Sequence, residues 1–436
     1  MLASVVRAVL AVLLAAVSWQ VVESSCPVQG CQTNHNFAIN LKETATAKLG
    51  WKSSLYRPST AGCVSVSHQV ACPIRNRLIV FDVDGNEQWK SAASYSESSS
   101  LPVYTANNAA LFYSGGFNYS SHFVNGTLRF AVETRGGTAL GSTVVGSGNG
   151  EKVALSENGG GFLMIDERMN ELFIFDDGDG YVYVAYSQPV AGRGNTAYVI
   201  TYAFPYASAA DRWPGHRLIA VDVMVNPGPE FNATRRTVHE VSFEGYDLNN
   251  PWADPAILFA DDVIYFRFRK FEKESHRDYL FAVRDVGEGG GTQLWNASFP
   301  TGASIQYMAF SDHGHKGLIV AFEEDNETRI HVLSPSTGSL QRVVRLSDSA
   351  IRLSAPLFYV RPPSDSGDGA LLVAFEAESP GVALISLETG DSVWSLPSPD
   401  GSSVLGQMAP TGNDGSGAAT SIVCATNTTL FSILLQ

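Results

Sequence analysis

The segment Leu78–Trp89, with the sequence LIVFDVDGNEQW, decides how the rest of this chain is interpreted. An apolar run comes first, a turn around Gly85 follows, and a second short run ends at Trp89. Two interpretations compete, a short acidic calcium loop or one hairpin of a repeated β-structure. The calcium interpretation rests on the oxygen-bearing residues Asp82, Asp84, Asn86 and Glu87.

The same order of features recurs along the chain. The copies read HRLIAVDVMV at 216–225, DYLFAVRDVGEGGGTQLW at 278–295, TRIHVLSPSTGSLQRVV at 328–344 and GVALISLETGDSVW at 381–394, with a weaker copy, GTLRFAVETRGGTALGSTVV, at 126–145. Successive copies lie about 40 to 60 residues apart, which is the spacing typical of four-stranded propeller blades. We therefore interpret the opening segment as one unit of this repeat.

The copies also decide between the two interpretations of the turn. The position of Asp82 is held by Arg284, Ser334 or Ser386 in three copies, and a required metal ligand would not tolerate these replacements. The turns share a glycine instead, which permits a positive φ angle between two strands. Asp82 and Asp84 are therefore interpreted as turn carboxylates, with calcium binding retained as the alternative.

Beyond the amino terminus, no apolar pattern of helical period is sustained. Short β-rich runs, such as ELFIFDDGDGYVYVAY and ALLVAFEA, alternate with turns rich in Gly, Asn, Asp and Pro. These features predict an all-β chain. Residues 25–436 are expected to form a single β-propeller of four-stranded antiparallel blades.

The repeats resemble those of the quinoprotein-alcohol-dehydrogenase-like propellers, also called PQQ-like repeats. LIVFDVDGNEQW, LISLETGDSVW and LFAVRDVGEGGGTQLW carry this resemblance. It implies that the tryptophan of each repeat docks between neighbouring blades, and the matching residues are Trp51, Trp89, Trp295 and Trp394. The chain has no adjacent pair of cysteines, and none of that family's calcium or catalytic-base positions can be matched. The resemblance therefore implies the fold rather than the quinone chemistry.

The two ends of the chain look like parts of one blade. The final TNTTLFSILLQ has the pattern of a third strand, while TATAKLGW, ending at Trp51, is a tryptophan strand with nothing before it. We predict that these ends share a blade and close the ring, which removes exposed sheet edges. Counting tryptophan strands gives eight blades, with seven as the alternative because residues 146–245 are difficult to divide.

The amino terminus predicts secretion. Arg7 is followed by the apolar run AVLAVLLAAVSW, which fits a signal peptide over residues 1–24, with cleavage after about residue 18 to 24. No later run approaches the roughly 20 apolar residues of a membrane span, so no membrane insertion is expected. The net charge of −14 argues against nucleic acid as a partner. Glycosylation sequons begin at Asn118, Asn125, Asn232, Asn296, Asn326 and Asn427.

The five cysteines should mostly pair in an oxidising compartment. In CVSVSHQVAC, a two-residue turn would place Cys63 directly opposite Cys72, so this disulfide is predicted. The other three cannot all pair within the chain. Either Cys26 pairs with Cys31 and Cys424 is free, or Cys424 pairs with one of those two.

Few residues carry recognisable site chemistry. His313 and His315 lie two apart in DHGH, and Asp176 and Asp179 belong to the acidic turn DDGDGY. These four are the candidate metal ligands, although no further ligand at a suitable spacing accompanies them. We predict no catalytic residue, no cofactor-binding residue and no cofactor, with calcium as the alternative.

One dense charged run, RFRKFEKESHR at 267–277, predicts a hairpin whose tip stands in solvent. Its basic residues could hold an acidic partner, with Phe268 and Phe271 adding apolar surface. A solubilising role is the favoured interpretation, and contact with an acidic partner is the alternative.

Together these features favour a secreted, glycosylated propeller that binds or scaffolds another protein without catalysis. The first alternative is a quinone- or metal-dependent oxidoreductase or hydrolase, which needs carboxylates or histidines at the innermost strands of the central funnel. The second is a carbohydrate-binding propeller, which would expose aromatic residues such as Trp213 or Trp252 on one rim.

Overall fold

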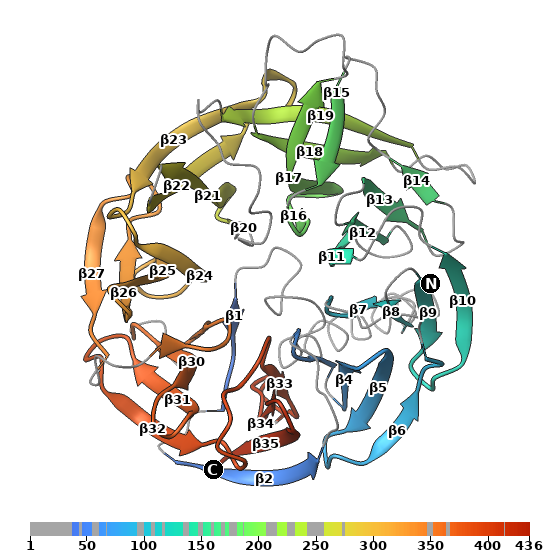
Figure 1. The fold of residues 1–436 in the computed structure, drawn as a ribbon, viewed down its shortest axis with the longest axis vertical. Helices are drawn as coiled ribbons and strands as arrows, with labels where there is room; N and C mark the ends of the chain where they lie inside the picture. The colour runs from blue at the N-terminus through green and yellow to red at the C-terminus, as the bar shows by residue number, and fades with distance from the viewer. Residues whose placement is uncertain are drawn as a thin grey trace, which may run out of the picture.

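The structure is a computed structural model in which eight β-sheets form a ring around a central space (Figure 1). The prediction of an all-β propeller with eight blades is confirmed. In the described part of the chain, the 3₁₀ turn η2 (Gly287–Gly289) is the one helical element, and no helix there has the length and hydropathy to cross a membrane. The described residues are 37–42, 46–54, 61–66, 68–93, 100–105, 110–115, 118–133, 139–146, 151–157, 161–166, 171–173, 181–185, 187–205, 216–224, 232–241, 257–272, 275–346, 352–362, 367–413 and 415–436.

The first four blades use the following strands, given from the axis outward. Blade 1 contains β3 (Val64–Val66), β4 (Gln69–Ile74), β5 (Arg77–Asp82) and β6 (Glu87–Lys90). Blade 2 contains β7 (Val103–Thr105), β8 (Ala110–Gly115), β9 (Asn118–Phe123) and β10 (Leu128–Glu133). Blade 3 contains β11 (Ala139–Val145), β12 (Lys152–Glu157), β13 (Phe162–Ile165) and β14 (Glu171–Phe173). Blade 4 contains β15 (Tyr181–Ala185) and β16 (Val190–Ala191), then β17 (Thr196–Pro205), β18 (His216–Met224) and β19 (Asn232–Val241).

The last four blades complete the ring. Blade 5 contains β20 (Ile257–Ala260), β21 (Val263–Glu272), β22 (Ser275–Asp285) and β23 (Gly291–Ser298). Blade 6 contains β24 (Ser304–Ser311), β25 (Gly317–Glu324), β26 (Glu327–Leu333) and β27 (Leu340–Val344). Blade 7 contains β28 (Arg352–Leu353), β29 (Phe358–Val360), β30 (Ala370–Glu376), β31 (Gly381–Ser386) and β32 (Ser392–Pro397), with β1 (Ala38–Ile39) inside β29. Blade 8 contains β33 (Ala409–Thr411), β34 (Ser421–Ala425), β35 (Thr429–Leu435) and β2 (Ala47–Ser54).

The sequence pattern of each strand follows its depth in the blade. The third strand β31 reads GVALIS and is buried along nearly its whole length, because neighbouring blades cover both of its faces. The outermost strand β32 reads SVWSLP and buries chiefly Trp394. In each repeat, the apolar run therefore forms the third strand of a blade, and the alternating run that contains the tryptophan forms the fourth strand.

Ring closure uses both ends of the chain, as predicted. The strand β2 pairs antiparallel with β35, so the amino-terminal segment supplies the outermost strand of a blade whose other strands are carboxy-terminal. A second connection was not predicted. The strand β1 pairs parallel with β29 of blade 7, and Leu41 then forms a parallel bridge with Ala419 of blade 8. Figure 1 shows β1 on the inner side of blade 7.

One repeat assignment was wrong. The segment 126–145 does not contain a third and a fourth strand, because it spans the outermost strand β10 of blade 2 and the innermost strand β11 of blade 3. The chain therefore passes from blade 2 to blade 3 within this segment. Glycine marks both kinds of connection, so spacing from the next tryptophan is the better guide to strand position.

Candidate functional site

The two faces of the ring carry different connections. We number the strands of a blade A to D from the axis outward, and because neighbouring strands are antiparallel, the A–B and C–D turns lie on one face. We call this the AB–CD face. The B–C turns and the connections between blades lie on the opposite BC–DA face.

Three tryptophans join neighbouring blades in the same way on the AB–CD face. The indole N–H of Trp51 in blade 8 donates a hydrogen bond of 2.7 Å to the carbonyl of Val83 in the C–D turn of blade 1. In the same way, the indole N–H of Trp89 in blade 1 donates to the carbonyl of Val124 in blade 2 at 2.9 Å, and that of Trp295 in blade 5 donates to the carbonyl of Pro335 in blade 6 at 2.8 Å. Each bond crosses from one blade to the next.

The turn glycines make room for these rings. Gly85 has a positive φ of 84°, and a Cβ atom there would lie 2.4 Å from the Trp51 ring. A Cβ atom on Gly338 would lie 2.6 Å from the ring of Trp295. The glycine of the repeat therefore serves the turn and the docking of the indole together.

The carboxylate of Asp82 organises one such turn. The backbone N–H groups of Asp84 and Asn86 donate to its Oδ1, at 3.0 and 2.8 Å, and the side-chain amides of Asn86 and Gln88 donate to its Oδ2. Burial alone would raise the pKa of Asp82, but these hydrogen bonds hold it below its usual value. Both oxygens of Asp82 already accept hydrogen bonds from N–H groups, so the lone pairs that would coordinate calcium are in use. This agrees with the interpretation of Asp82 as a turn carboxylate.

Arginine replaces tryptophan between blades 6 and 7. Arg342 pairs with Val332 beside a β-bulge, in the register at which Trp295 pairs with Ala282 in blade 5. Its Nη1 donates to the carbonyl of Leu387 at 2.9 Å, in the next C–D turn. Searching the sequence for the tryptophan of each repeat misses Arg342. Aligning the blades on their β-bulges places Arg342 at the tryptophan position.

Trp394 behaves differently from the other three predicted docking residues. Its indole N–H is buried, and it has no hydrogen-bond partner among the described residues. The next blade is blade 8, where the third and fourth strands β35 and β2 belong to opposite ends of the chain. No C–D turn links these strands, so the carbonyl that the other indoles use is missing.

A pocket of about 330 Å³ lies on the AB–CD face between blades 6 and 7. It adjoins Arg342, the residue that matches Trp295 of blade 5 in the strand register. In blade 5, Trp295 packs in one cluster with Ala260, Val263 and Ala282. The residues at the same strand positions in blade 6 are Ser311, Gly317 and Val332, in that order. The pocket is lined by Ser311, His315, Val332, Gln341, Arg342, Asp368 and Leu387.

Asp368 is the acidic group of this pocket. Its Oδ2 lies 2.7 Å from Nη2 of Arg342, and its Oδ1 lies 3.0 Å from Nδ1 of His315. Burial alone would raise the pKa of Asp368, but hydrogen bonds from Arg342 and His315 hold it below its usual value, so it is ionised at neutral pH. The side chain of His315 is 89% exposed, so its contact with Asp368 is at the surface.

Ion pairs tie neighbouring blades together on the same face. Arg361 of blade 7 contacts Asp312 of blade 6 at 2.7 Å and donates to Oδ1 of Asn40 in the amino-terminal segment at 3.2 Å. Lys316 of blade 6 contacts Asp261 of blade 5 at 2.8 Å. Together with the pair between Arg193 and Asp262, these contacts run from blade 4 to blade 7.

The candidate metal ligands are not brought together as far as the structure describes them. His313 contacts Asp312 at 2.8 Å, whereas His315 contacts Asp368, so the two imidazoles have different partners. Among the described residues, no group of three or more His, Cys, Asp or Glu side chains could hold a metal ion. Asp176 and Asp179 lie outside the described residues, as do Trp213 and Trp252.

The charged run at 267–277 forms the predicted hairpin, in which β21 and β22 pair as far as Glu272 and Ser275, while its tip and the side chain of Phe271 lie outside the described residues. The strands below the tip are less exposed than predicted. Phe268 is 2% exposed and packs against Phe266 and Phe281, so it adds no apolar surface. Arg269 forms two hydrogen bonds with Asp278, at 2.7 and 3.1 Å. The charge pattern indicated exposure because the strand position of Asp278, which neutralises the arginines, could not be inferred from spacing alone.

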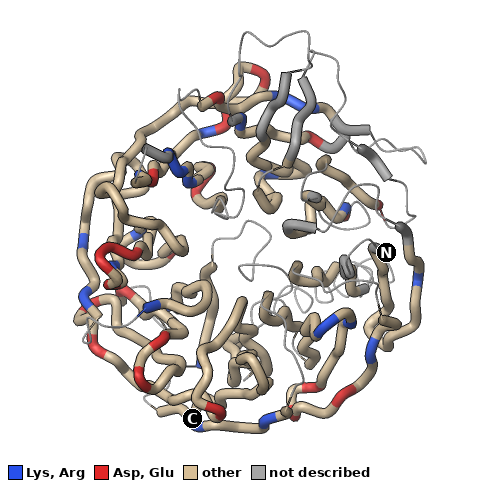
Figure 2. The backbone as a smooth tube through the Cα atoms, viewed as in Figure 1, with Lys and Arg blue, Asp and Glu red and all other residues tan. Residues whose placement is uncertain are grey.

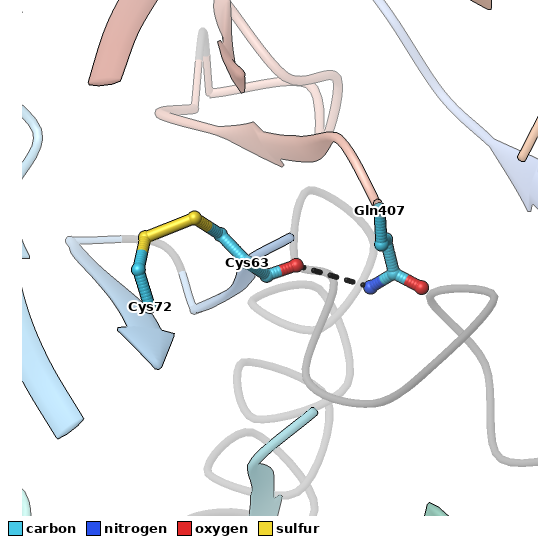
Figure 3. The surroundings of a disulfide bond; sticks show 3 residues. All are labelled: Cys63, Cys72 and Gln407. Atoms are coloured by element: carbon cyan, nitrogen blue, oxygen red, sulfur yellow. Dashed lines mark hydrogen bonds between the residues drawn. A yellow bond between two sulfur atoms is a disulfide. The ribbon is translucent and has the colours of Figure 1, made fainter. Parts of the chain in front are cut away.

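The disulfide between Cys63 and Cys72 lies where blade 1 meets blade 8 (Figure 3). Its Cα atoms are 4.4 Å apart, across the hairpin of β3 and β4. Gln407 of blade 8 donates from Nε2 to the carbonyl of Cys63 at 3.2 Å. Cys424 is a buried free thiol whose pKa burial raises, while Cys26 and Cys31 lie outside the described residues.

Replacing both Cys63 and Cys72 by alanine should lower the free energy of unfolding by about 2–4 kcal/mol, because the cross-link restricts the unfolded chain. Urea titration of the purified variant measures this loss. Cys424→Ala is the control, because it removes a buried thiol without removing a cross-link. A loss for the double variant no larger than that for Cys424→Ala would contradict the prediction.

Four histidines are poorly solvated in the folded chain. Burial lowers the pKa of each, and their side chains lie at or near contacts between strands and blades. The ring of His122 contacts the ring of Trp89, and His239 contacts Phe266 and Phe281 of the next blade. The four residues are His122, His239, His276 and His331.

These histidines predict that mild acid destabilises the fold. The unfolded chain binds protons near pH 6.5 and the folded chain only at lower pH, so stability is complete above pH 6.5 and falls below it. Urea titrations at pH 7.5 and pH 5.5 should therefore show a lower free energy of unfolding at pH 5.5. The difference should shrink in His239→Phe, and an unchanged difference would exclude a contribution from His239.

The sequons leave one part of the surface clear. Asn125, Asn296, Asn326 and Asn427 are exposed in the structure. On the AB–CD face, sequons occur only at the C–D connections of blades 2 and 4, at Asn125 and Asn232. Asn326 and Asn427 lie in B–C turns, on the opposite face. The AB–CD side of blades 5 to 8 therefore carries no sequon in its described turns.

Comparison with known proteins supports the fold alone. No protein-family model matches the chain, and no curated protein sequence matches it. Two structures of Sqt1 from Chaetomium thermophilum have TM-scores of 0.55 and 0.56, at 12% and 10% identity, over 90% and 91% of this chain and 98% and 100% of those chains. The Dos1 propeller has a TM-score of 0.53 at 9% identity, over 90% of this chain and 96% of that chain. The shared architecture is a β-propeller.

Proposed function

We propose that this chain is a secreted, N-glycosylated β-propeller that binds a protein partner on its AB–CD face, over blades 5 to 8, and does not catalyse a reaction. The observation that carries the proposal is the pocket between blades 6 and 7, which is open on a face that ion pairs hold together. A rigid ring with an open pocket suits recognition, because little conformational entropy is lost on binding.

The position of the sequons supports this choice of face. Glycans attached at Asn326 and Asn427 would project from the BC–DA face, those at Asn125 and Asn232 from blades 2 and 4, and one at Asn296 from the outermost strand of blade 5, outside the turns of the AB–CD face. The disulfide and the exposed sequons are consistent with an oxidising, secretory environment.

The innermost strands favour binding over catalysis in the funnel. Arg352 of β28 is the one Asp, Glu, Lys, Arg or His in the described strands nearest the axis, and it lies 3.6 Å from Glu323 of blade 6. The others, β1, β3, β7, β11, β15, β16, β20, β24, β29 and β33, contain none. Figure 2 shows the charged residues mostly away from these strands. Acid–base catalysis needs such side chains within reach of a substrate.

The PQQ-like character of the repeat is part of the proposal. It is supported by the contacts of Trp51, Trp89 and Trp295 with the following blade, which agree with the docking role that the resemblance implies. The replacement of tryptophan by Arg342 departs from that pattern at one blade.

A glycan placed on either face tests the proposal. Thr337→Asn creates the sequon Asn-Gly-Ser in the exposed C–D turn of blade 6, whereas Ala377→Asn creates Asn-Glu-Ser in an exposed B–C turn of blade 7. Both variants and the natural chain are purified from a secreting eukaryotic cell without chelators, and occupancy and bound molecules are measured by native mass spectrometry. We expect a stoichiometric protein partner on the natural chain and on Ala377→Asn, and its loss from Thr337→Asn. A bound quinone or stoichiometric metal without a partner would overturn the proposal, as would equal binding by all three chains.

A further inference from the structure

The C–D turn of blade 2 carries a large apolar side chain beside a glycosylation sequon. Phe123 ends β9 and is 43% exposed, and Asn125 begins the sequon Asn-Gly-Thr two residues later. Among the six sequons of the chain, this is the one with an aromatic residue two positions before its asparagine. The phenylalanine ring leaves apolar surface in contact with water, and a neighbouring group that covered this surface would stabilise the turn.

Backbone hydrogen bonds fix the shape of the turn. The N–H of Gly126 donates to the carbonyl of Phe123 at 2.8 Å, and the N–H of Phe123 donates to the carbonyl of Thr127 at 2.9 Å. Gly126 has a φ of 86°, which is typical of a three-residue hairpin loop that ends in a left-handed residue. Phe123 and Thr127 therefore lie opposite each other, and opposite residues of a hairpin direct their side chains to the same face.

Blade 1 holds the same turn in place. The indole of Trp89 and the side-chain amide of Gln69 both donate to the carbonyl of Val124, at 2.9 and 3.1 Å. A Cβ atom on Gly126 would lie 2.7 Å from the Trp89 ring, so the two blades are in close contact here. A group attached to this turn therefore meets a surface that is already ordered, and little conformational entropy is lost in the contact.

The side chain of Asn125 is oriented by the residue that completes its sequon. Its Oδ1 accepts a hydrogen bond of 3.1 Å from the backbone N–H of Thr127. This contact directs the carboxamide toward the strand that follows the turn, on which Thr127 lies opposite Phe123. It also leaves Nδ2, the atom that carries an N-linked glycan, for attachment of a sugar.

The Phe123 ring offers a surface that suits a sugar. The guanidinium carbon of Arg129 lies 5.1 Å from the ring centroid, over one face, and the remaining surface contributes to the exposure of the residue. An aromatic face carries partial negative charge. The C–H groups on one side of an N-acetylglucosamine ring are apolar and slightly positive, so they pack favourably on such a face.

We propose that Asn125 carries an N-linked glycan whose first N-acetylglucosamine packs on the ring of Phe123 and becomes a structural part of blade 2. The inference rests on the proposed function, because it requires secretion and glycosylation. In the transfer, Nδ2 of Asn125 forms a bond to C1 of the sugar and loses one hydrogen, and the lipid pyrophosphate that carried the sugar leaves with that proton. The sugar then covers the exposed ring and stabilises the turn on which Trp89 docks.

The test observes this first sugar directly. The full chain is produced in a secreting eukaryotic cell supplied with ¹³C-labelled N-acetylglucosamine, and an endoglycosidase trims each glycan to its first sugar. The NMR signals of the sugar on Asn125 are identified by their loss in Asn125→Gln. Protons above an aromatic ring are shifted upfield by the ring current, so these signals should lie upfield of those from the other occupied sites.

Substitutions at Phe123 assign the shift to its ring. Phe123→Leu keeps an apolar side chain without a ring, so the sugar signals should return to the range of the other sites, whereas Phe123→Tyr should keep the upfield shift. Leu128→Ala is the matched control, because Leu128 is 54% exposed in the same hairpin but lies opposite His122, on the other face. A shift that is absent from the natural chain, or that persists in Phe123→Leu, would overturn the inference.

Thermal unfolding by calorimetry measures the stabilisation independently. Asn125→Gln should lower the melting temperature of the glycosylated chain by about 1 °C, the size expected of one aromatic contact in a chain of this length. The same substitution made in Phe123→Leu should have a smaller effect, because the contact is already lost. Equal decreases in the two backgrounds would contradict the packing of the sugar on Phe123.

The inference and the proposed function can fail separately. If no sequon of the secreted chain carries a glycan, the glycosylation in the proposed function fails, and the inference fails with it. If other sequons are glycosylated but Asn125 is bare, or its sugar gives the same signals as theirs, only the inference fails. Binding of a protein partner is tested by Thr337→Asn, and that result does not depend on Asn125.

Discussion

Replacing Asp278 by asparagine should lower the free energy of unfolding by about 3–5 kcal/mol, because it leaves buried arginine charge without a counter-ion. The Asp278 side chain is fully buried and lies 2.7 Å from Nε of Arg269. Arg267, which is also buried, lies 4.0 Å away and donates to the carbonyl of Ile305. Asparagine keeps the shape of the side chain, so the variant reports the charge rather than a cavity.

The effect should extend beyond blade 5. The backbone N–H of Ile305 donates to Oδ2 of Asp278 at 2.7 Å, and Arg269 also donates to Ser304. Both residues begin the first strand of blade 6, so Asp278 joins two blades on the BC–DA face. Amide hydrogen exchange should therefore become faster at the start of β24 as well as in the hairpin of β21 and β22.

Urea titration is the measurement, and Asp261→Asn is the matched control. Asp261 also contacts a cation of the neighbouring blade, Lys316, but both side chains are largely exposed. Such pairs contribute about 0–1 kcal/mol, so the control should lose little. Equal losses for the two variants would show that burial does not decide the contribution of these ion pairs.

Replacing Trp295 by alanine should cost about 3–5 kcal/mol, because the indole fills the contact between blades 5 and 6. Trp295 is 7% exposed and packs near Tyr265, with ring centroids 6.0 Å apart. Gly338 would then face a void, since no side chain of its own replaces the ring. Urea titration measures the loss, and a value below about 1 kcal/mol would contradict docking as the source of stability.

Phenylalanine substitutions separate the hydrogen bond from the packing. Trp295→Phe removes the N–H that donates to Pro335 and leaves that carbonyl without its partner. Trp394→Phe removes an N–H that has no described partner. The first substitution should therefore cost about 0.5–1.5 kcal/mol more than the second, because only the half-buried carbonyl of Pro335 loses a hydrogen bond. Equal costs would show that the indole hydrogen bonds contribute little.

The fold could be predicted because the features that define each blade lie close together in the sequence. A third strand, a glycine turn and a fourth strand with its tryptophan lie within about a dozen residues. Counting the copies of this pattern predicted eight blades, and the incomplete copies at the two ends predicted that β2 and β35 share a blade. The candidate site was harder because its parts are distant. Arg342 becomes recognisable as the successor of a tryptophan only when the β-bulge fixes its register, and Asp368 reaches it from the next blade. Likewise, the charge pattern predicted that Arg267 and Arg269 would be exposed, but ion pairs with Asp278 allow them to be buried or nearly so.

The pairing of β2 with β35 has a consequence for synthesis of the chain. The backbone N–H of Trp51 donates a hydrogen bond to Ser432 although 381 residues separate them, so β2 is synthesised long before its partner β35. At roughly 5–20 residues per second, the wait lasts about 20–80 s. Throughout that time β2 has no strand to pair with, and blade 8 is incomplete until β35 has left the ribosome. An extended strand of this kind is a binding site for chaperones, and a ribosome-bound chain that stops before β33 should retain a chaperone that the finished ring releases.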